Sequence, residues 1–218
     1  GVDEVLTRLF AEGRARRCIV VAVWNTPDRR VEYYPQKAFA TLPAAWQDSL
    51  RKDIGGTSRE PRSDSYLRFL VEELKPFIDG QYATRPGRKH TFIMGSSMGG
   101  LISMYAMCEY PAVFGAAACL STHWPGSVFR NEPRIAQGFV DYLRQHAPDP
   151  RTHRFYFDYG TATLDAWYEP YQLQVDEVLR GKGFSAKNLR TLRCAGEPHT
   201  EAAWRKRLHE PLLFLLGR

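Results

Sequence analysis

The chain has 218 residues, of which 44% are hydrophobic and 13% aromatic; this suffices for one buried core, so we expect residues 1–218 to form a single soluble domain. No stretch approaches the roughly 18 uninterrupted apolar residues of a membrane-spanning helix. We therefore expect no membrane partner. The formal charge of +6 comes from 30 Lys and Arg against 24 Asp and Glu. Because the basic residues are scattered, with Arg14, Arg16 and Arg17 as the densest cluster, we expect no nucleic-acid partner, and a basic nucleic-acid module is the last alternative.

The four cysteines, Cys18, Cys108, Cys119 and Cys194, show no CxxC spacing. They are therefore predicted to be buried free thiols, which leaves the redox compartment open. The sequence opens with Gly1 and shows no basic stretch followed by an apolar signal region. The cytoplasm is the favoured compartment, although removal of an upstream signal would change that expectation.

The first helix is predicted at the start of the chain, with Gly13 as its stop. Its apolar positions follow helical spacing: Val2, Val5, Leu6, Leu9 and Phe10. The run CIVVAVW from Cys18 to Trp24 is continuously apolar. Such a run predicts a parallel strand covered by helices on both faces.

A stretch rich in Gly, Pro, Ser and charge follows, and residues 35–64 are predicted to form a loop or lid. Asp64 is expected to cap the next helix, whose apolar residues extend to Ile78. Pro76 should kink this helix, because proline lacks the backbone donor and clashes with the preceding turn.

Strands and helices alternate through the rest of the chain. Strands are expected at Lys89–Met94, Ala116–Leu120, Arg154–Tyr159 and Leu189–Cys194, and helices after GSSMGG as far as Pro111, near Ile135–Arg144, at about Pro170–Arg180 and at about Glu201–Leu216. This order predicts an α/β fold, with a mainly parallel sheet between two layers of helices.

Gly95-Ser96-Ser97-Met98-Gly99 matches the pattern G-x-S-x-G between an apolar strand and an amphipathic helix. In that context the serine occupies a strained strand-to-helix turn, and the flanking glycines avoid collisions. Ser97 is the expected nucleophile, since Ser96 stands at the variable position. The Met98 N–H, at the N-terminus of the following helix, is the expected oxyanion-hole donor.

A serine hydroxyl needs a base, and in such folds the chain order is serine, acid, histidine. His199 is favoured because it lies in the turn between the last strand and the last helix. His209 falls within the final helix, and His146 and His153 flank a polar stretch and are expected to be solvated. His123, just past a strand, could line the pocket.

Two carboxylates could orient the base, Asp158 and Asp165. Asp158 lies within a predicted strand, where alternation fixes its direction. Asp165 lies in the loop beyond Gly160 and could reach across to an imidazole, so Asp165 is favoured. No metal or organic cofactor is required for this chemistry.

Several segments resemble the esterase D family of α/β-hydrolases, which includes S-formylglutathione hydrolases, feruloyl and acetylxylan esterases, siderophore esterases and mycolyltransferases. They are FLVEELKPFID, GSSMGGLISMYAMCEYP, FDYGTATLD, GEPHTEAAW, and IVVAVWNTPDRRVEYYP with its Asn25, Arg29, Glu32, Tyr33 and Pro35. The resemblance implies an α/β-hydrolase fold, ester hydrolysis, and a triad of Ser97, Asp165 and His199.

The family pattern also includes several strands and an H-D-G segment before the helix that opens this chain. We therefore expect an N-terminally truncated fold, unless another segment supplies that part. The second oxyanion donor would then be missing, and an exposed sheet edge could pair with another copy of the chain.

The substrate is expected to be a small-molecule ester, with feruloyl or acetyl-carbohydrate esters slightly favoured. Thioesters, peptides and siderophore lactones remain alternatives, as does a catalytically weak scaffold. The pocket walls are expected in the loop from Asn25 to Asp64, which includes Arg29, and around His123, Trp124, Trp167 and Tyr168.

Overall fold

The computed structural model describes residues 1–55 and 60–217. At its centre lies a four-stranded sheet in the order β1-β2-β3-β4, and each neighbouring pair of strands is parallel. The strands are β1 (Phe92–Ser96), β2 (Ala116–Leu120), β3 (Arg154–Gly160) and β4 (Leu189–Cys194). Because the strands are parallel, their carboxyl ends meet at one edge of the sheet, where the following loops converge.

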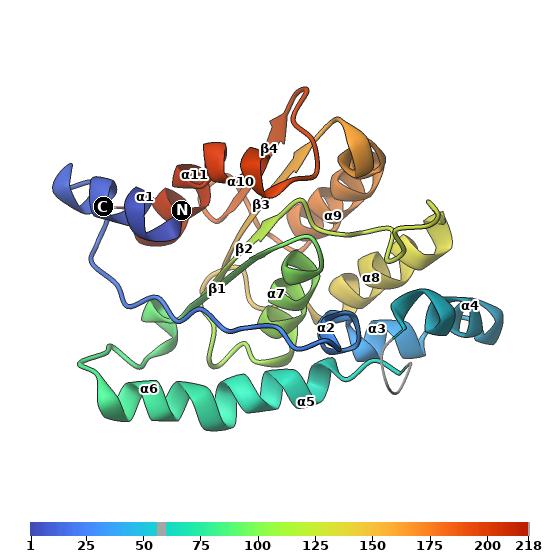
Figure 1. Ribbon diagram of the computed structural model, residues 1–218, viewed down its shortest axis with the longest axis horizontal. Coiled ribbons are helices and arrows are strands. Elements are labelled where there is room, and N and C mark those ends of the chain that lie inside the picture. The colour runs from blue at the N-terminus through green and yellow to red at the C-terminus, as the bar shows by residue number, and fades with distance from the viewer. Residues whose placement is uncertain (56–59, 218) are drawn as a thin grey trace.

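Helices cover both faces of this sheet (Figure 1). One face is covered by α1 (Val2–Ala11), α10 (Glu201–Arg207) and α11 (His209–Leu216). The other is covered by α7 (Met98–Glu109), α8 (Pro133–His146) and α9 (Glu169–Gly181). The remaining helices are α2 (Arg29–Tyr33), α3 (Gln36–Ala40), α4 (Ala44–Ile54), α5 (Ser63–Arg68), the π-helix η1 (Phe69–Leu74), α6 (Lys75–Gln81), and the 3₁₀ turns η2 (Arg88–His90) and η3 (Thr163–Trp167).

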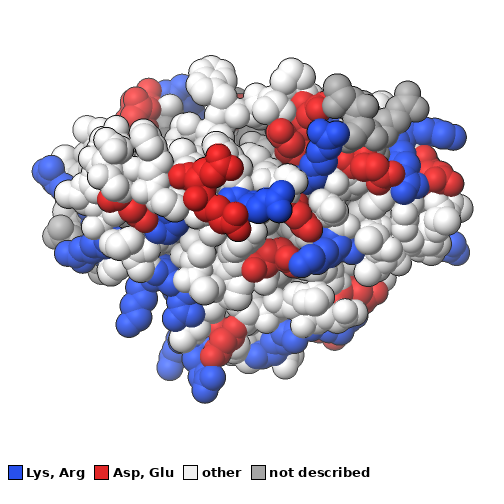
Figure 2. Space-filling view, turned by 90° about the horizontal axis from the view of Figure 1, so that it is seen from below, with Lys and Arg blue, Asp and Glu red and all other residues white. Residues whose placement is uncertain are grey.

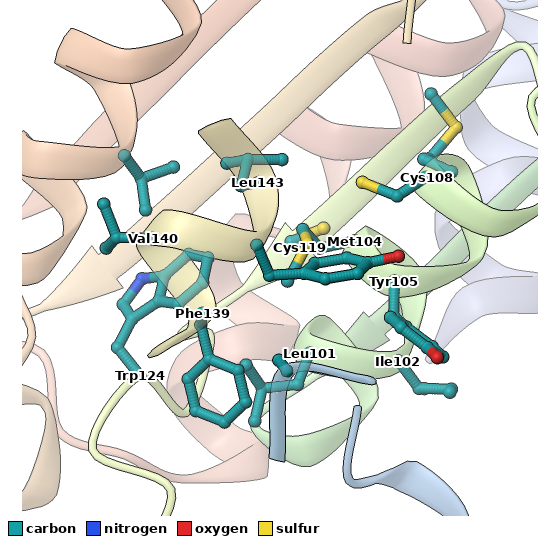
Figure 3. Close-up of a cluster of buried hydrophobic side chains, with 14 of the residues drawn as sticks. Leu101, Ile102, Met104, Tyr105, Cys108, Cys119, Trp124, Phe139, Val140 and Leu143 are labelled. Atoms are coloured by element: carbon teal, nitrogen blue, oxygen red, sulfur yellow. The ribbon is translucent and has the colours of Figure 1, made fainter. Parts of the chain in front are cut away.

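Alternation along β2 separates two hydrophobic cores. Ala117 and Cys119 point into the core formed with α7 and α8, whereas Ala116, Ala118 and Leu120 point into the core formed with α1 and α11. Figure 3 shows the first core, in which α7 residues such as Leu101 pack with residues of α8. The predicted three-layer α/β fold is thereby confirmed.

The predicted strand at Cys18–Trp24 is wrong. Within residues 1–55 and 60–217 no strand precedes β1, and residues 18–24 run without regular structure. Ile19, Val20 and Trp24 are 48, 54 and 93% exposed. The apolar run signalled a capacity for burial, but a strand also needs ladder hydrogen bonds from a neighbour, and no hydrogen bonds between this run and β1 form.

The predicted loop at residues 35–64 contains two helices, α3 and α4, and its residues 56–59 lie outside the described part. Helical periodicity is hidden because Pro43 separates the two short helices and precedes the first residue of α4. Phe39, Leu50 and Ile54 anchor them in the core. The helices replace the loop, and a lid role for this segment stays a prediction.

Proline also shapes the two longest predicted helices. The helix through Pro76 continues, but it passes through η1 just before the proline, where wider turns accommodate a missing donor. The helix predicted at Glu201–Leu216 is divided at Leu208, because Pro211 cannot donate to the carbonyl of Arg207. Asp64 does not cap α5; its Oδ1 accepts a hydrogen bond from the Tyr105 hydroxyl at 2.5 Å.

All four cysteines are free, with Cys108 and Cys119 buried and Cys18 and Cys194 partly exposed, so the prediction of burial holds for two of them. In the described part of the chain, no helix combines the length and hydrophobicity needed to cross a bilayer. On the face shown in Figure 2, acidic side chains lie among the basic ones.

Candidate active site

Ser97 stands at the turn between β1 and α7 with φ 59° and ψ −120°, a left-handed conformation that is costly for a residue with a side chain. The turn closes so tightly that a Cβ on Gly95 would lie 2.6 Å from the Gly99 carbonyl oxygen. The predicted need for glycine therefore holds at Gly95. At Gly99 it does not, because a Cβ there would meet nothing within 4 Å.

Three side chains from separate loops form a continuous hydrogen-bonded chain. Ser97 Oγ lies 2.9 Å from His199 Nε2, and His199 Nδ1 lies 2.5 Å from Asp165 Oδ1. His199 follows β4 and Asp165 follows β3, so the parallel sheet delivers both to the carboxyl end of β1. The structure thus brings together the three residues predicted as a triad.

Asp165 is fully buried, and its second oxygen is also engaged. Oδ2 accepts hydrogen bonds from the Gly160 N–H at 2.6 Å and from the Ser121 hydroxyl at 2.6 Å. Burial alone would raise the pKa of Asp165, but the hydrogen bonds from His199, Ser121 and Gly160 outweigh it and lower that pKa below its ordinary value. Asp165 is therefore held as a carboxylate.

His199 is packed between two aromatic rings. The rings of Tyr168 and Trp204 meet the imidazole edge to face, with centroids 5.6 and 4.9 Å away. The imidazole side chain remains 13% exposed, and Ser97 is half-buried. Ser97 and His199 are thus partly exposed, whereas the carboxylate of Asp165 is not.

Met98 is the first residue of α7, so its backbone N–H has no acceptor within the helix and lies at the positive end of the helix dipole. The role of this N–H as an oxyanion donor stays a prediction.

Asp158, the alternative acid, does not reach His199. Its Oδ1 accepts from Arg207 Nη2 at 2.9 Å and its Oδ2 accepts from the Tyr156 hydroxyl at 3.1 Å. Strand alternation turns its side chain toward the α10 side of the sheet, on the opposite face from Phe157.

His123 is 2% exposed and lies next to the nucleophile, since its N–H donates to the Ser97 carbonyl at 3.2 Å. Its Nδ1 lies 2.7 Å from the Tyr168 hydroxyl. Burial, and then the nearby His199, Arg30 and Arg29, lower the pKa of His123 to about 3, so this imidazole is neutral at neutral pH.

The other predicted pocket residues are dispersed. Trp124 is 1% exposed and donates to Gln172 at 3.0 Å, so its ring makes core contacts (Figure 3) instead of lining an open pocket. Trp167 is half-buried against the same core. Asn25 is exposed, and Arg29 stacks over the Tyr33 ring at 5.5 Å.

A cavity of about 650 Å³ lies apart from these groups. Residues from the apolar run at 18–24 and from α5 and η1 contribute to its lining. The lining residues are Val21, Ala22, Val23, Trp24, Thr26, Glu32, Arg62, Ser65, Tyr66, Phe69 and Leu74. None of the three hydrogen-bonded residues lines it.

In residues 1–55 and 60–217, no group of three or more His, Cys, Asp or Glu side chains is arranged to hold a metal ion. His153, expected to be solvated, is 3% exposed, and its ring nitrogens lie 3.0 and 2.8 Å from the Asp149 and Pro111 carbonyl oxygens. It is held there by structural contacts.

Sequence reasoning missed three residues around the site: Ser121, Trp204 and Arg207. Ser121 directly follows the carboxyl end of β2, a position at which polar residues meet the other loops. Trp204 and Arg207 stand three residues apart on α10, so they share one face of the helix that follows His199. That spacing was the available signal.

Two curated proteins illustrate what this chain is similar to. Among curated proteins, the uncharacterized protein YbbA of Bacillus subtilis (strain 168) is 22% identical over 222 residues, which cover 99% of this chain and 80% of that protein. The probable esterase PIR7A of Oryza sativa subsp. indica is 25% identical over 134 residues, covering 62% of this chain and 47% of that protein.

Solved structures show the same fold. A ferulic acid esterase has a TM-score of 0.64 and 19% identity, covering 98% of this chain and 76% of that chain. The enterobactin esterase FES from Shigella flexneri has a TM-score of 0.64 and 17% identity, covering 96% of this chain and 47% of that chain. The IroE-like serine hydrolase from Shewanella oneidensis has a TM-score of 0.66 and 18% identity, covering 97% of this chain and 65% of that chain.

At these identities the structural likeness shows an α/β-hydrolase fold. A family model described as Putative esterase matches residues 2–215, nearly the whole chain. The chain therefore belongs to this esterase family of α/β-hydrolases.

Proposed function

We propose that this chain hydrolyses carboxylic esters through an acyl-enzyme on Ser97. One observation carries the proposal, the unbroken contact from Ser97 Oγ to His199 Nε2 at 2.9 Å and from His199 Nδ1 to Asp165 Oδ1 at 2.5 Å. This is the geometry in which a base can take a proton from a hydroxyl nucleophile. Membership of the esterase family supports the same reaction class.

In the first half-reaction, Ser97 Oγ attacks the ester carbonyl while His199 Nε2 takes its proton. The tetrahedral intermediate collapses, the bond to the alcohol breaks, and His199 returns the proton to the departing alcohol. In the second half, His199 removes a proton from water, which attacks the acyl carbonyl; the bond between the acyl carbon and Ser97 Oγ then breaks, His199 returns the proton to Ser97 Oγ, and the acid leaves. Asp165 holds the Nδ1–H tautomer throughout.

The oxyanion formed in both halves would be stabilised by the Met98 N–H and the positive end of α7. His123 adds no positive charge near the reacting oxygen at neutral pH, because its pKa is about 3 after burial. Its contact with Tyr168 instead links the segment after β2 to the junction between η3 and α9.

For the substrate, aromatic acyl or acetyl-carbohydrate esters are proposed, since the similar structures include a ferulic acid esterase. A siderophore lactone is the second candidate, because enterobactin esterase FES has a similar fold. A thioester remains a third.

The experiment compares the wild-type chain with Ser97→Ala. A fluorophosphonate probe should label the wild type and not the variant, and 4-nitrophenyl acetate, ethyl ferulate, acetylated xylan and an S-acyl thioester should be turned over by the wild type alone. His209→Gln is a matched control, because this histidine lies on α11 outside the hydrogen-bonded chain. Equal residual rates in wild type and Ser97→Ala would reject the nucleophile, and an unlabelled, inactive wild type would favour a scaffold.

A further inference from the structure

Ser121 connects the proposed triad to a second buried cluster. It follows β2 with φ 41°, a left-handed conformation, and is fully buried. Its hydroxyl oxygen lies 2.6 Å from Asp165 Oδ2, 2.9 Å from Trp204 Nε1 and 2.9 Å from Arg207 Nη2. Three partners therefore surround one hydroxyl group.

The chemistry of these partners fixes the direction of the Ser121 hydrogen. The indole of Trp204 and the guanidinium of Arg207 can only donate, so they occupy the two lone pairs of the oxygen. The carboxylate of Asp165 can only accept. The single hydroxyl hydrogen must therefore point at Asp165 Oδ2.

Arg207 is itself held in place by Asp158. Its Nη2 also donates to Asp158 Oδ1 at 2.9 Å, and the two side chains are 7 and 0% exposed. The Nε and Nη1 atoms of Arg207 are buried without a hydrogen-bond partner in the described part of the chain. Burying an arginine that uses one of its three nitrogens is expensive, so stability alone is a poor reason for its presence.

We propose that Arg207 and Ser121 are positioning residues for the triad, in which the guanidinium held by Asp158 orients the Ser121 hydroxyl onto Asp165 Oδ2, leaving Oδ1 for His199. The inference rests on the proposed function and adds a set of residues that orient its acid. Trp204 contributes twice, by donating to Ser121 and by packing its ring against His199.

Arg207 and Asp158 form a buried ion pair beside the Asp165 carboxylate. Other titratable groups near the cluster are unchanged in the test below: Tyr156 on β3, Cys194 at the end of β4, and Glu197. Around His199 the same holds for Tyr168 and for His123, on which Arg29 and Arg30 of α2 act.

The test uses Ser121→Ala and Asp158→Asn, with rates on 4-nitrophenyl acetate expressed per Ser97 labelled by the fluorophosphonate probe. Labelling is carried to completion, so that it counts folded sites whatever their rate and separates misfolded protein from impaired chemistry. Ser121→Ala should lower kcat roughly 10-fold with KM little changed, because it removes one charge-assisted hydrogen bond from the acid.

Asp158→Asn leaves the Arg207 charge uncompensated, which disfavours a protonated His199. The acid limb of the pH profile of kcat/KM should therefore move roughly 0.5 to 1 pH unit lower. Asp176→Asn is the matched control, since Asp176 is a buried, ion-paired aspartate on α9 whose partners are Arg180, Gln172 and Thr191. It should keep the wild-type limb.

Wild-type kcat and an unmoved acid limb per labelled site in both cluster variants would overturn the inference while leaving the proposed function intact. If Asp158→Asn does not fold, the kcat of Ser121→Ala decides. A wild type that neither labels nor turns over ester removes the proposed function, and this inference with it.

Discussion

Replacing Gly160 by alanine tests whether the loops of the proposed triad are held by backbone packing. Gly160 ends β3, and a Cβ there would lie 2.0 Å from the Glu197 carbonyl oxygen and 2.9 Å from Asp165 Oδ2. Contacts under 3.0 Å cannot be absorbed in place when the neighbour is backbone. The loops bearing Asp165 and His199 must therefore separate.

The cost has two parts. Overpacking of this kind destabilises by about 1–3 kcal/mol, which for a chain of this size lowers Tm by roughly 2–12 °C. The same movement strains the Gly160 N–H bond to Asp165 at 2.6 Å and the bonds from Thr161 and Ala162 to Glu197. A displacement near 1 Å at reacting groups can cost roughly 100-fold in rate, so kcat/KM should fall about that much.

The assay measures kcat/KM on 4-nitrophenyl acetate below the Tm of the variant, together with thermal unfolding followed by circular dichroism. Gly80→Ala is the matched control, because a Cβ at this position in α6 meets nothing within 4 Å and alanine favours a helix. A Gly160→Ala enzyme with wild-type kcat/KM and Tm would refute the reasoning that this close approach fixes the two loops.

Three further predictions concern charge and burial. Burial lowers the pKa of His123 to about 3, so below about pH 6.5 the unfolded chain binds a proton that the folded chain does not. The free energy of unfolding should therefore fall by up to about 1.4 kcal/mol per pH unit between roughly pH 6 and 4. Urea unfolding of His123→Gln should show a shallower fall. The pKa of Asp165 is lowered in the folded chain, so the ionised carboxylate stabilises the fold above about pH 4, and this contribution is lost as the pH falls through the folded-state pKa. Asp165→Asn should reduce kcat roughly 10³- to 10⁴-fold at pH 7. The difference in Tm between this variant and the wild type should shrink below pH 4. Trp24→Ser should change the free energy of unfolding by less than about 0.5 kcal/mol, since Trp24 is 93% exposed, whereas Trp124→Ala should cost about 3–5 kcal/mol; a large loss for Trp24→Ser would show that the run 18–24 is buried after all.

Pairing of the β1 edge with another copy of the chain stays a prediction. Among the described residues β1 has one strand neighbour, β2. The exposed apolar side chains of Ile19, Val20 and Val21 belong to the segment that fails to form the expected strand.

The sequence alone determined the features that depend on local order. The continuous apolar run at Ala116–Leu120 predicted a strand, because helices on both faces of a sheet require burial on both faces. Leu189–Cys194 was also predicted as a strand, although Arg190 and Arg193 interrupt its apolar residues. The G-x-S-x-G motif around Ser97 identified the turn between β1 and α7, because the motif has this meaning only between a strand and a helix. The alternation of strands and helices predicted a parallel sheet, and this placed Asp165 and His199 at the edge where the carboxyl ends of the strands meet.

Tertiary structure decided what local order could not express. Whether residues 18–24 form a strand depends on a neighbouring strand, which no residue within that run encodes. Asp158 and Asp165 carry the same side chain a few residues apart, and only the loop beyond Gly160 turns one to His199 while β3 turns the other to Arg207. The contact of Ser121 with Arg207, 86 residues away in the chain, exists because the folded sheet brings the end of β2 against α10.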